Sequence, residues 1–315
     1  MAKIKTTSKI KKTQAENFFW IDINNPGKEE LDFIRQTFEF HPLDIEDIKQ
    51  KTQRSKIDKY TKYIFLALLF PVYNTTTQEI EYSEVDIFLG NDFLVTIHKS
   101  DMPLFEKLIG LCQVDQNSKE KILGNNPAKL MYEILDRLYT YCFPMLDHIS
   151  TDLEEMEKRI FGNNEKEMVE NILSVRRNIT NYRKMMQPHR KVLQKLMKGN
   201  QKSDLFYINN GYEVYIDNLV DHAKEIWEAL DAFKESVEAL HETNEAIFSH
   251  KLNKTMKTLT AVSVILLPLN IIIALWGMNL DVPFTNNEFG FWIIVIITVI
   301  LGALFALYLR FIKWL

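Results

Sequence analysis

The chain has 315 residues, of which 46% are hydrophobic and 25% are charged, and its formal net charge at pH 7 is -4. This composition is typical of a folded protein of two or three domains and excludes a largely disordered chain. We expect no nucleic-acid partner. Cys112 and Cys142 stand in no metal-type or redox-type spacing, so they are interpreted as reduced thiols in a cytosolic compartment.

Residues 1–16 carry several lysines with no apolar run behind them, which excludes a secretory signal and predicts a mobile basic tail. Residues 17–125 are predicted to form a cytosolic α/β domain. Its first strand is "FFWIDIN", and "NNPGKEELDFIRQTF" then predicts a helix capped by Asn25. Three further strands are "KYTKYIFLALLFPVYN", "EIEYSEVDIFLG" and "DFLVTIHK". The short turns between them favour a largely antiparallel sheet.

Two long helical patterns separated by the turn "GNN" predict a cytosolic helical hairpin over residues 126–210. From Gly211 onward no glycine or proline occurs before Pro268, which predicts one uninterrupted helix over residues 211–278. At ~1.5 Å per residue this helix is roughly 100 Å long, much longer than a bilayer is thick. Its cytosolic part is therefore a stalk, whose apolar stripe needs partner helices, and we expect an oligomer.

The end of the chain has two long stretches without charge. No charged residue occurs from Leu259 to Met278 or from Phe289 to Leu309, and each stretch has the ~20 residues that span a bilayer. This pattern favours two transmembrane helices over a pair of buried core helices. We assign residues 211–278 to the stalk with the first span, 279–288 to an outer loop, 289–312 to the second span and 313–315 to a cytosolic tail.

The charges that flank the spans predict the topology. The basic residues lie on one side, at Lys251, Lys254, Lys257, Arg310 and Lys313. The connecting loop has only acidic charges. By the positive-inside rule, both termini face the cytoplasm and the loop faces outward. We expect a multi-pass protein of the inner or plasma membrane.

A stripe at helical spacing runs along the first span. Its members are Asn253, Met256, Thr260, Ser263, Leu267 and Asn270. The amide of Asn270 lies near the middle of the membrane, where facing lipid without a hydrogen bond costs several kcal/mol. The stripe therefore either lines a pore or holds two helices together through a hydrogen bond. The residues alone leave both interpretations open.

No enzymatic site emerges from the sequence. There is no glycine-rich phosphate loop, no Cys/His metal spacing and no nucleophile elbow, which disfavours an ATP-driven pump. The seven histidines are scattered along the chain. The sequence leaves open that the chain is a membrane-anchored cation sensor or scaffold that transports nothing. Against this, polar residues at regular helical spacing along the first span would have no use in a simple membrane anchor.

The segment "TMKTLTAVSVILLPLNIIIALWGMNL", a short loop, a second span and the end "RFIKWL" together resemble the CorA family of divalent-cation transporters. That family has Gly-Met-Asn at the outer end of the first of two C-terminal spans. Two further blocks look like the family, namely "WIDINNPGKEELDFIRQTFEFHPLDIEDIKQKTQRSKIDKYTKYIFLALL" and "RRNITNYRKMMQPHRKVLQKL". The resemblance covers nearly the whole chain after residue 17.

The resemblance implies a homopentamer with a cytosolic funnel, a pore lined by the first span and an outer ring of second spans. It places the selectivity filter at Gly277, Met278 and Asn279. Neutral oxygens there would bind a hydrated Mg²⁺ through its water. It implies a pore lining of Asn253, Met256, Leu259, Ser263, Leu267, Asn270 and Ala274. Uptake of Mg²⁺, and of Co²⁺ or Ni²⁺, would be driven by the membrane potential.

The resemblance also implies a regulatory Mg²⁺ site between neighbouring subunits. Glu46 and Asp47 match the family's acidic pair on one side of that site. On the other side Asn218 stands where an acid is expected, flanked by Asp217 and Asp221. The loop "LDVPFTNN" also departs from the commoner Met-Pro-Glu type, and Trp276 replaces the commoner tyrosine. A zinc transporter of the ZntB type, and the direction of transport, therefore stay open.

Overall fold

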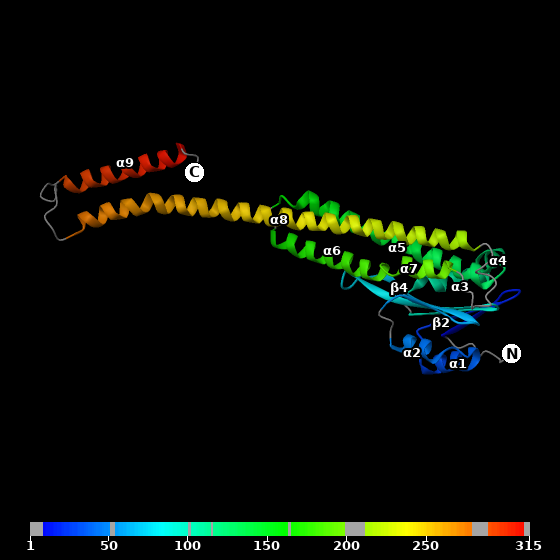
Figure 1. Ribbon diagram of the computed structural model, residues 1–315. Helices are drawn as coiled ribbons and strands as arrows, with labels where there is room; N and C mark the ends of the chain where they lie inside the picture. Colours follow the sequence, from blue (N-terminus) through cyan, green and yellow to red (C-terminus); the bar gives the residue numbers. More distant parts are fainter. Residues whose placement is uncertain are drawn as a thin grey trace. The chain divides into compact units, whose positions relative to one another are not determined.

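The computed structural model describes residues 9–50, 54–99, 102–114, 116–162, 165–198, 212–278 and 289–311. The chain divides into two compact units. Unit 1 comprises Met1–Ile160 and Lys166–Leu240, and unit 2 comprises Phe161–Glu165 and His241–Leu315. Strands and helices both occur, as Figure 1 shows, which confirms the predicted α+β class.

The described residues of unit 1 form a six-stranded sheet. Its strands are β1 (Ile10–Gln14), β2 (Phe19–Asn24), β3 (Lys56–Lys59), β4 (Tyr63–Asn74), β5 (Glu79–Gly90) and β6 (Phe93–His98). They lie in the order β1-β2-β6-β5-β4-β3, and β2 and β6 form the one parallel pair. The predicted largely antiparallel sheet is confirmed. Short turns join β4 to β5 and β5 to β6, so these strands pair as hairpins.

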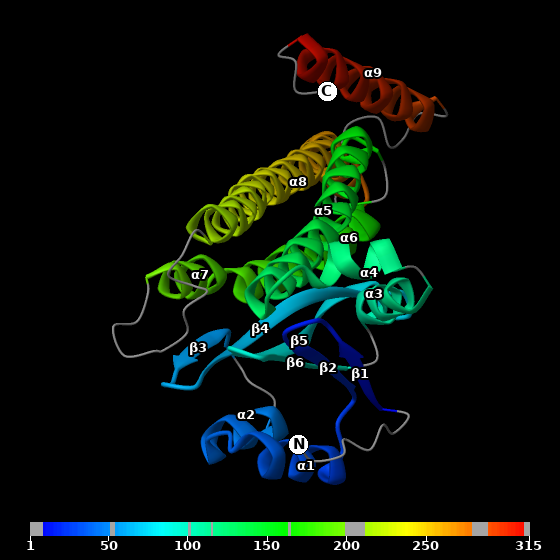
Figure 2. The same cartoon turned by 90° about the vertical axis from the view of Figure 1, so that its right-hand side faces the viewer.

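Helices cover both faces of this sheet (Figure 2). One face carries α1 (Lys28–Phe38) and α2 (Pro42–Gln50), whose apolar side chains pack with Ile23 and Ile97 of the sheet. The other face carries α3 (Pro103–Val114), α4 (Gln116–Leu123), α5 (Pro127–Arg159), α6 (Glu165–Met186) and α7 (His189–Met197). Residues on alternate positions of a strand therefore enter two separate cores.

The prediction of a mobile tail over residues 1–16 is wrong for residues 10–14, which form β1. Ile10 is only 3% exposed and belongs to the core under α1, and β1 pairs with β2 along its whole length. Lys12 is exposed on this edge strand, where a lysine opposes pairing with another sheet edge. Residues 1–8 lie outside the described part of the chain.

The predicted cap of the first helix is also wrong. The residue at the cap is Gly27, whose backbone N–H donates to the Glu30 carboxylate at 2.8 Å. Asn25 instead takes a left-handed backbone conformation with φ of 51° at the end of β2. Asparagine tolerates that conformation better than most residues, so Asn25 serves the turn rather than the helix.

The long helices predicted after residue 125 are present as α5 and α6. The imidazole of His189, at the start of α7, is fully buried and joins three elements. Its Nε2 donates to the Leu69 carbonyl of β4, and its Nδ1 accepts from the Tyr139 hydroxyl of α5, both at 2.9 Å. Burial lowers the pKa of His189 to about 4, so it is a neutral packing residue.

The predicted uninterrupted helix is confirmed as α8 (Glu213–Trp276), which has 64 residues and contains Pro268. α8 belongs to unit 1 as far as Leu240 and to unit 2 from His241. The second apolar stretch forms α9 (Gly290–Phe311) in unit 2. Residues 279–288 and 312–315 lie outside the described residues, so the predicted outer loop and C-terminal tail are not described.

Candidate ion pathway and regulatory surface

The two apolar stretches are not core helices of this chain. In the most apolar 18-residue window of α8 and of α9, only 6% of the residues are buried within the protein. A core helix of a soluble protein would be mostly buried. These helices therefore present their apolar side chains to something outside the described chain, as membrane-spanning helices do.

One face of α8 is occupied by α9. Ala261 on α8 is fully buried. Leu269 of α8 packs against Gly302 of α9, and a Cβ added to Gly302 would lie 3.2 Å from the Leu269 Cδ1. Thr298, Gly302 and Ala306 repeat every fourth residue on the α9 side and are all partly buried. Small residues at this spacing let two membrane helices approach closely.

The face of α8 away from Ala261 and Leu269 carries the seven residues of the expected pore lining, which we call the pore stripe. All seven of its residues are exposed, namely Asn253, Met256, Leu259, Ser263, Leu267, Asn270 and Ala274. At 3.6 residues per turn, this stripe lies on the side of the helix opposite to α9. It is thus available to water or to other copies of the chain.

Among the described residues, no hydrogen bond joins a polar member of the stripe on α8 to α9. The Ser263 hydroxyl donates to the Leu259 carbonyl of its own helix at 2.9 Å, and Thr298 of α9 donates to the Ile294 carbonyl at 2.8 Å. Asn270 is exposed on the face away from α9. Asn270 therefore does not join α8 to α9 through a hydrogen bond, which favours the pore-lining interpretation of this amide.

The predicted filter begins where α8 ends. The Gly277 N–H is shared between the carbonyls of Ile273 and Ala274, at 3.0 and 3.2 Å. A Cβ on Gly277 would meet these two oxygens at an ordinary 3.5 Å, and its φ is not left-handed. Among the described residues of one protomer, nothing therefore requires glycine here. Met278 is half exposed, and Asn279 lies outside the described residues.

The predicted regulatory residues lie on two elements. Glu46 and Asp47 are on α2, on one side of the sheet, and Asp217, Asn218 and Asp221 are on α8, which lies with the helices of the other side (Figure 2). Among the described residues no three His, Cys, Asp or Glu side chains are placed to hold one metal ion. A single protomer therefore does not bring the two halves together.

Asp47 has a cationic partner that the sequence analysis missed. The Lys56 Nζ on β3 lies 2.5 Å from the Asp47 carboxylate and 2.7 Å from that of Asp58. Burial lowers the pKa of Lys56, but the hydrogen bonds to Asp47 and Asp58 raise it overall, so the ammonium stays charged. The alternation in "KID" predicts that Lys56 and Asp58 lie on the same face of a strand. No local pattern in the sequence predicts that this face packs against Asp47 of α2.

Asn218 also has partners that were missed. Its Nδ2 donates to the Tyr132 hydroxyl at 3.2 Å and lies 3.4 Å from an Asp136 carboxylate oxygen, both on α5. The same Asp136 oxygen lies 3.4 Å from His222 Nε2 on α8. The spacing of four between Tyr132 and Asp136 indicates that the two side chains share one face of a helix, and this was the available sequence signal for the contact. These contacts fix the amide of Asn218 beside an acid of its own chain.

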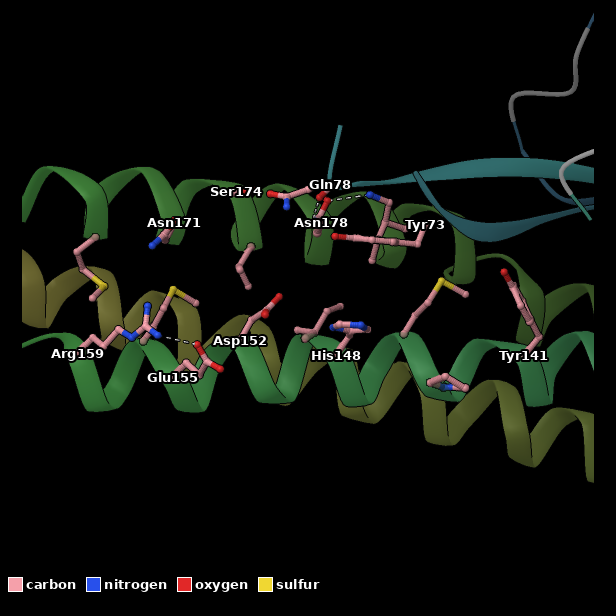
Figure 3. A pocket seen from close by; sticks show the side chains of 17 residues that line it. Tyr73, Gln78, Tyr141, His148, Asp152, Glu155, Arg159, Asn171, Ser174 and Asn178 are labelled. Carbon is pink, nitrogen blue, oxygen red and sulfur yellow. Dashed lines mark hydrogen bonds and ion pairs between the residues drawn. The ribbon is translucent and has the colours of Figure 1, made fainter. Parts of the chain in front are cut away.

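A pocket of about 480 Å³ lies between α5, α6 and the turn from β4 to β5 (Figure 3). Burial raises the pKa of Asp152 in its wall. Glu155 pairs with Arg159 at 3.3 Å, and Asn178 holds the turn by accepting the Ile80 N–H at 2.9 Å. The wall thus contains acids, an arginine and amides, and its described carboxylates do not form a cluster that could bind a metal ion.

The family profile described as "CorA-like Mg2+ transporter protein" matches residues 15–310. The protein YfjQ of Bacillus subtilis is 27% identical over 300 residues, which are 94% of this chain and 88% of YfjQ. The cobalt/magnesium transport protein CorA of Thermotoga maritima is 25% identical over 94% of this chain and 83% of its own. The complete structure of the CorA magnesium transporter from Methanocaldococcus jannaschii superimposes with a TM-score of 0.80 at 20% identity, over 95% and 92% of the two chains.

Proposed function

Because the chain belongs to the CorA-like Mg²⁺ transporter family, it is a membrane transporter of divalent metal cations and not an enzyme, and we propose that its principal ion is Mg²⁺. Co²⁺ and Ni²⁺ are expected to follow the same path. The single observation that carries the proposal is the stripe of α8 that faces away from α9. A membrane anchor would have no use for such a stripe.

We infer that five copies surround the pathway. The stripe from Asn253 to Ala274 would face the fivefold axis and α9 would form the outer ring, with lipid around it. The cytosolic part of α8 would pack against its copies to form a funnel. Purified protein in detergent is then expected to run as one species of five chains in native mass spectrometry. A monomer at micromolar concentration would contradict this assembly.

In this assembly the ion passes neutral oxygens before it meets apolar rings. Asn279 and the last carbonyls of α8 would bind the hydrated ion through its water, because Mg²⁺ keeps its shell of water tightly. Asn270 would form a second polar ring. Leu267, Leu259 and Met256, each more than half exposed in the protomer, would form constrictions that close by excluding water.

The proposed topology places both termini in the cytoplasm of a cell whose membrane is negative inside. The lysines at 251, 254 and 257 support it. A charge gains ~2.3 kcal/mol per 100 mV, and a divalent ion gains about twice that on entry. The membrane potential therefore suffices to drive uptake, and no nucleotide site is needed.

Regulation is proposed to act between copies. Since α2 and α8 lie on opposite sides of the sheet, Asp47 of one copy could meet Asp217 and Asp221 only on a neighbouring copy. Carboxylates brought together in this way repel each other when empty. A cytosolic Mg²⁺ between them would stabilise the closed arrangement, which couples ion binding to closure of the pore.

Competition between ions tests the substrate assignment. Purified protein in liposomes should take up Mg²⁺, and Co²⁺ and Ni²⁺ added outside should compete with it. If Zn²⁺ enters rapidly while Mg²⁺ neither enters nor competes, the chain is a zinc transporter of the ZntB type instead. Liposomes with no protein provide the baseline for each ion.

A further inference from the structure

Lys56 lies in a row of residues on one face of the sheet. In the strand registers Lys56 of β3 is opposite Ala67 of β4, and Ala67 is opposite Asp86 of β5. Residues opposite each other in a sheet project to the same side. Along the sheet, Ala67 is therefore the residue between the Lys56 and Asp86 positions, on the side of the sheet that α2 covers.

Asp86 has a carboxylate oxygen that has no hydrogen-bond partner among the described residues. Its side chain is 3% exposed, and its Oδ1 accepts no hydrogen bond from any described residue. Burial raises the pKa of Asp86, and the charges of Glu84 and Asp47 raise it further, whereas Lys56 lowers it. A buried polar group left unpaired is destabilising, so this carboxyl group is stabilised by a cation that reaches it.

The neighbouring acid Asp44 has no such capacity. It is fully buried, and its two oxygens accept from the hydroxyls of Tyr60 and Tyr63, at 2.9 and 2.8 Å. The Lys56 ammonium is held instead by Asp47 and Asp58, whose side chains are 36% and 42% exposed. An ion pair this exposed contributes little to stability, so a divalent cation can displace the ammonium from Asp47.

We propose that Lys56 is an internal competitor of the regulatory cation for Asp47, and that Asp86 accepts the Lys56 ammonium when the cation displaces it. This inference rests on the proposed role of Asp47 in regulation. With no ion bound, Lys56 pairs with Asp47 and reduces, without abolishing, the repulsion between Asp47 and the acids of the neighbouring copy. When Mg²⁺ takes Asp47, the flexible lysine stem lets the ammonium keep Asp58 and turn across Ala67 to Asp86.

The competition sets the ion concentration at which the pore closes. The experiment measures Mg²⁺ current through the full-length protein in planar bilayers as cytosolic-side Mg²⁺ is raised. Lys56→Gln should lower the half-inhibiting concentration roughly two- to fivefold, the range of a partly exposed ion pair. Asp86→Asn should raise it, because the displaced ammonium then has no buried acceptor. Lys62→Gln, which breaks the exposed pair with Glu39, is the matched control and should change nothing.

The double variant separates transfer of the ammonium from a simple change of charge. If Asp86 acts only by accepting Lys56, then Lys56→Gln with Asp86→Asn should behave as Lys56→Gln alone. Effects that add in the double variant would rule out Asp86 as the acceptor. Lys56→Arg keeps the positive charge, so its half-inhibiting Mg²⁺ concentration should stay near that of the wild type. This variant provides a second test if Lys56→Gln fails to assemble.

Two results overturn different statements. If Asp47→Asn shifts the half-inhibiting concentration and Lys56→Gln does not, Lys56 is no competitor while the regulatory site stands. If neither variant shifts it, the regulatory role of Asp47 itself is wrong, and the inference about Lys56 falls with it. Thermal unfolding of each variant in detergent checks that the cytosolic unit is intact.

Discussion

Replacing Asn279 with alanine is expected to lower Mg²⁺ uptake roughly a hundredfold or more while the oligomer stays assembled. In a pentamer the change removes five side-chain carbonyl oxygens from the mouth of the pore. Each hydrogen bond to the water shell of the ion contributes about 1 kcal/mol, and every 1.4 kcal/mol corresponds to a tenfold change. Capture of the hydrated ion at the mouth of the pore would then be the step that limits uptake.

The same loop offers a matched control for Asn279. Asn287 is another asparagine of the connection between the two spans, and it is not part of the Gly-Met-Asn sequence. Asn287→Ala should transport at nearly the wild-type rate. Uptake is measured in liposomes with equal amounts of protein, after native mass spectrometry has verified assembly. Wild-type uptake by Asn279→Ala would end the filter hypothesis.

Replacing Asp47 with asparagine should raise the cytosolic Mg²⁺ needed for half-inhibition, by roughly tenfold. Loss of one charged hydrogen-bonding partner typically costs about 1.5 to 3 kcal/mol, and the ion then has less differential affinity for the closed state. Asn218→Asp should act in the opposite direction, because it adds an acid beside Asp217 and Asp221. In that variant the empty site repels more strongly and the ion relieves more repulsion.

The measurement is the current at a fixed voltage while cytosolic-side Mg²⁺ is increased. Asp58→Asn is a useful comparison, because Asp58 shares Lys56 with Asp47 but lies on β3 rather than on α2. It should shift the threshold less than Asp47→Asn does. If the wild type, Asp47→Asn and Asn218→Asp all close at the same concentration, the sensor does not lie at this boundary.

Long periodic elements could be predicted from the sequence, whereas several short helices and strands could not. α8 has 64 residues with one internal proline, so its existence followed from the absence of breakers. α2, α3 and α4 have 9, 12 and 8 residues, and we did not predict them, because few turns give little periodicity. β1 was mistaken for a tail because its lysines look like a solvated segment, and its single buried Ile10 is a weak signal.

The pore stripe could be predicted because it lies on one helix, where residue spacing fixes the face. The surroundings of Asp47 and Asn218 could not, because they depend on how distant elements pack. Lys56 reaches Asp47 from β3, and Asp136 reaches Asn218 from α5, 82 positions away in the sequence. Contacts of this kind follow from sheet register and helix docking rather than from local spacing.

The central claim is that this chain conducts divalent cations through a pathway lined by α8. Mg²⁺ influx into liposomes that contain the purified oligomer tests it most directly, with the potential set by a potassium gradient and an ionophore. The influx should rise steeply as the interior becomes more negative, because the ion carries two charges, and it should fall roughly a hundredfold or more with Asn279→Ala. If the folded wild-type oligomer gives no influx at any inside-negative potential, the chain is a membrane-anchored scaffold and the claim is wrong.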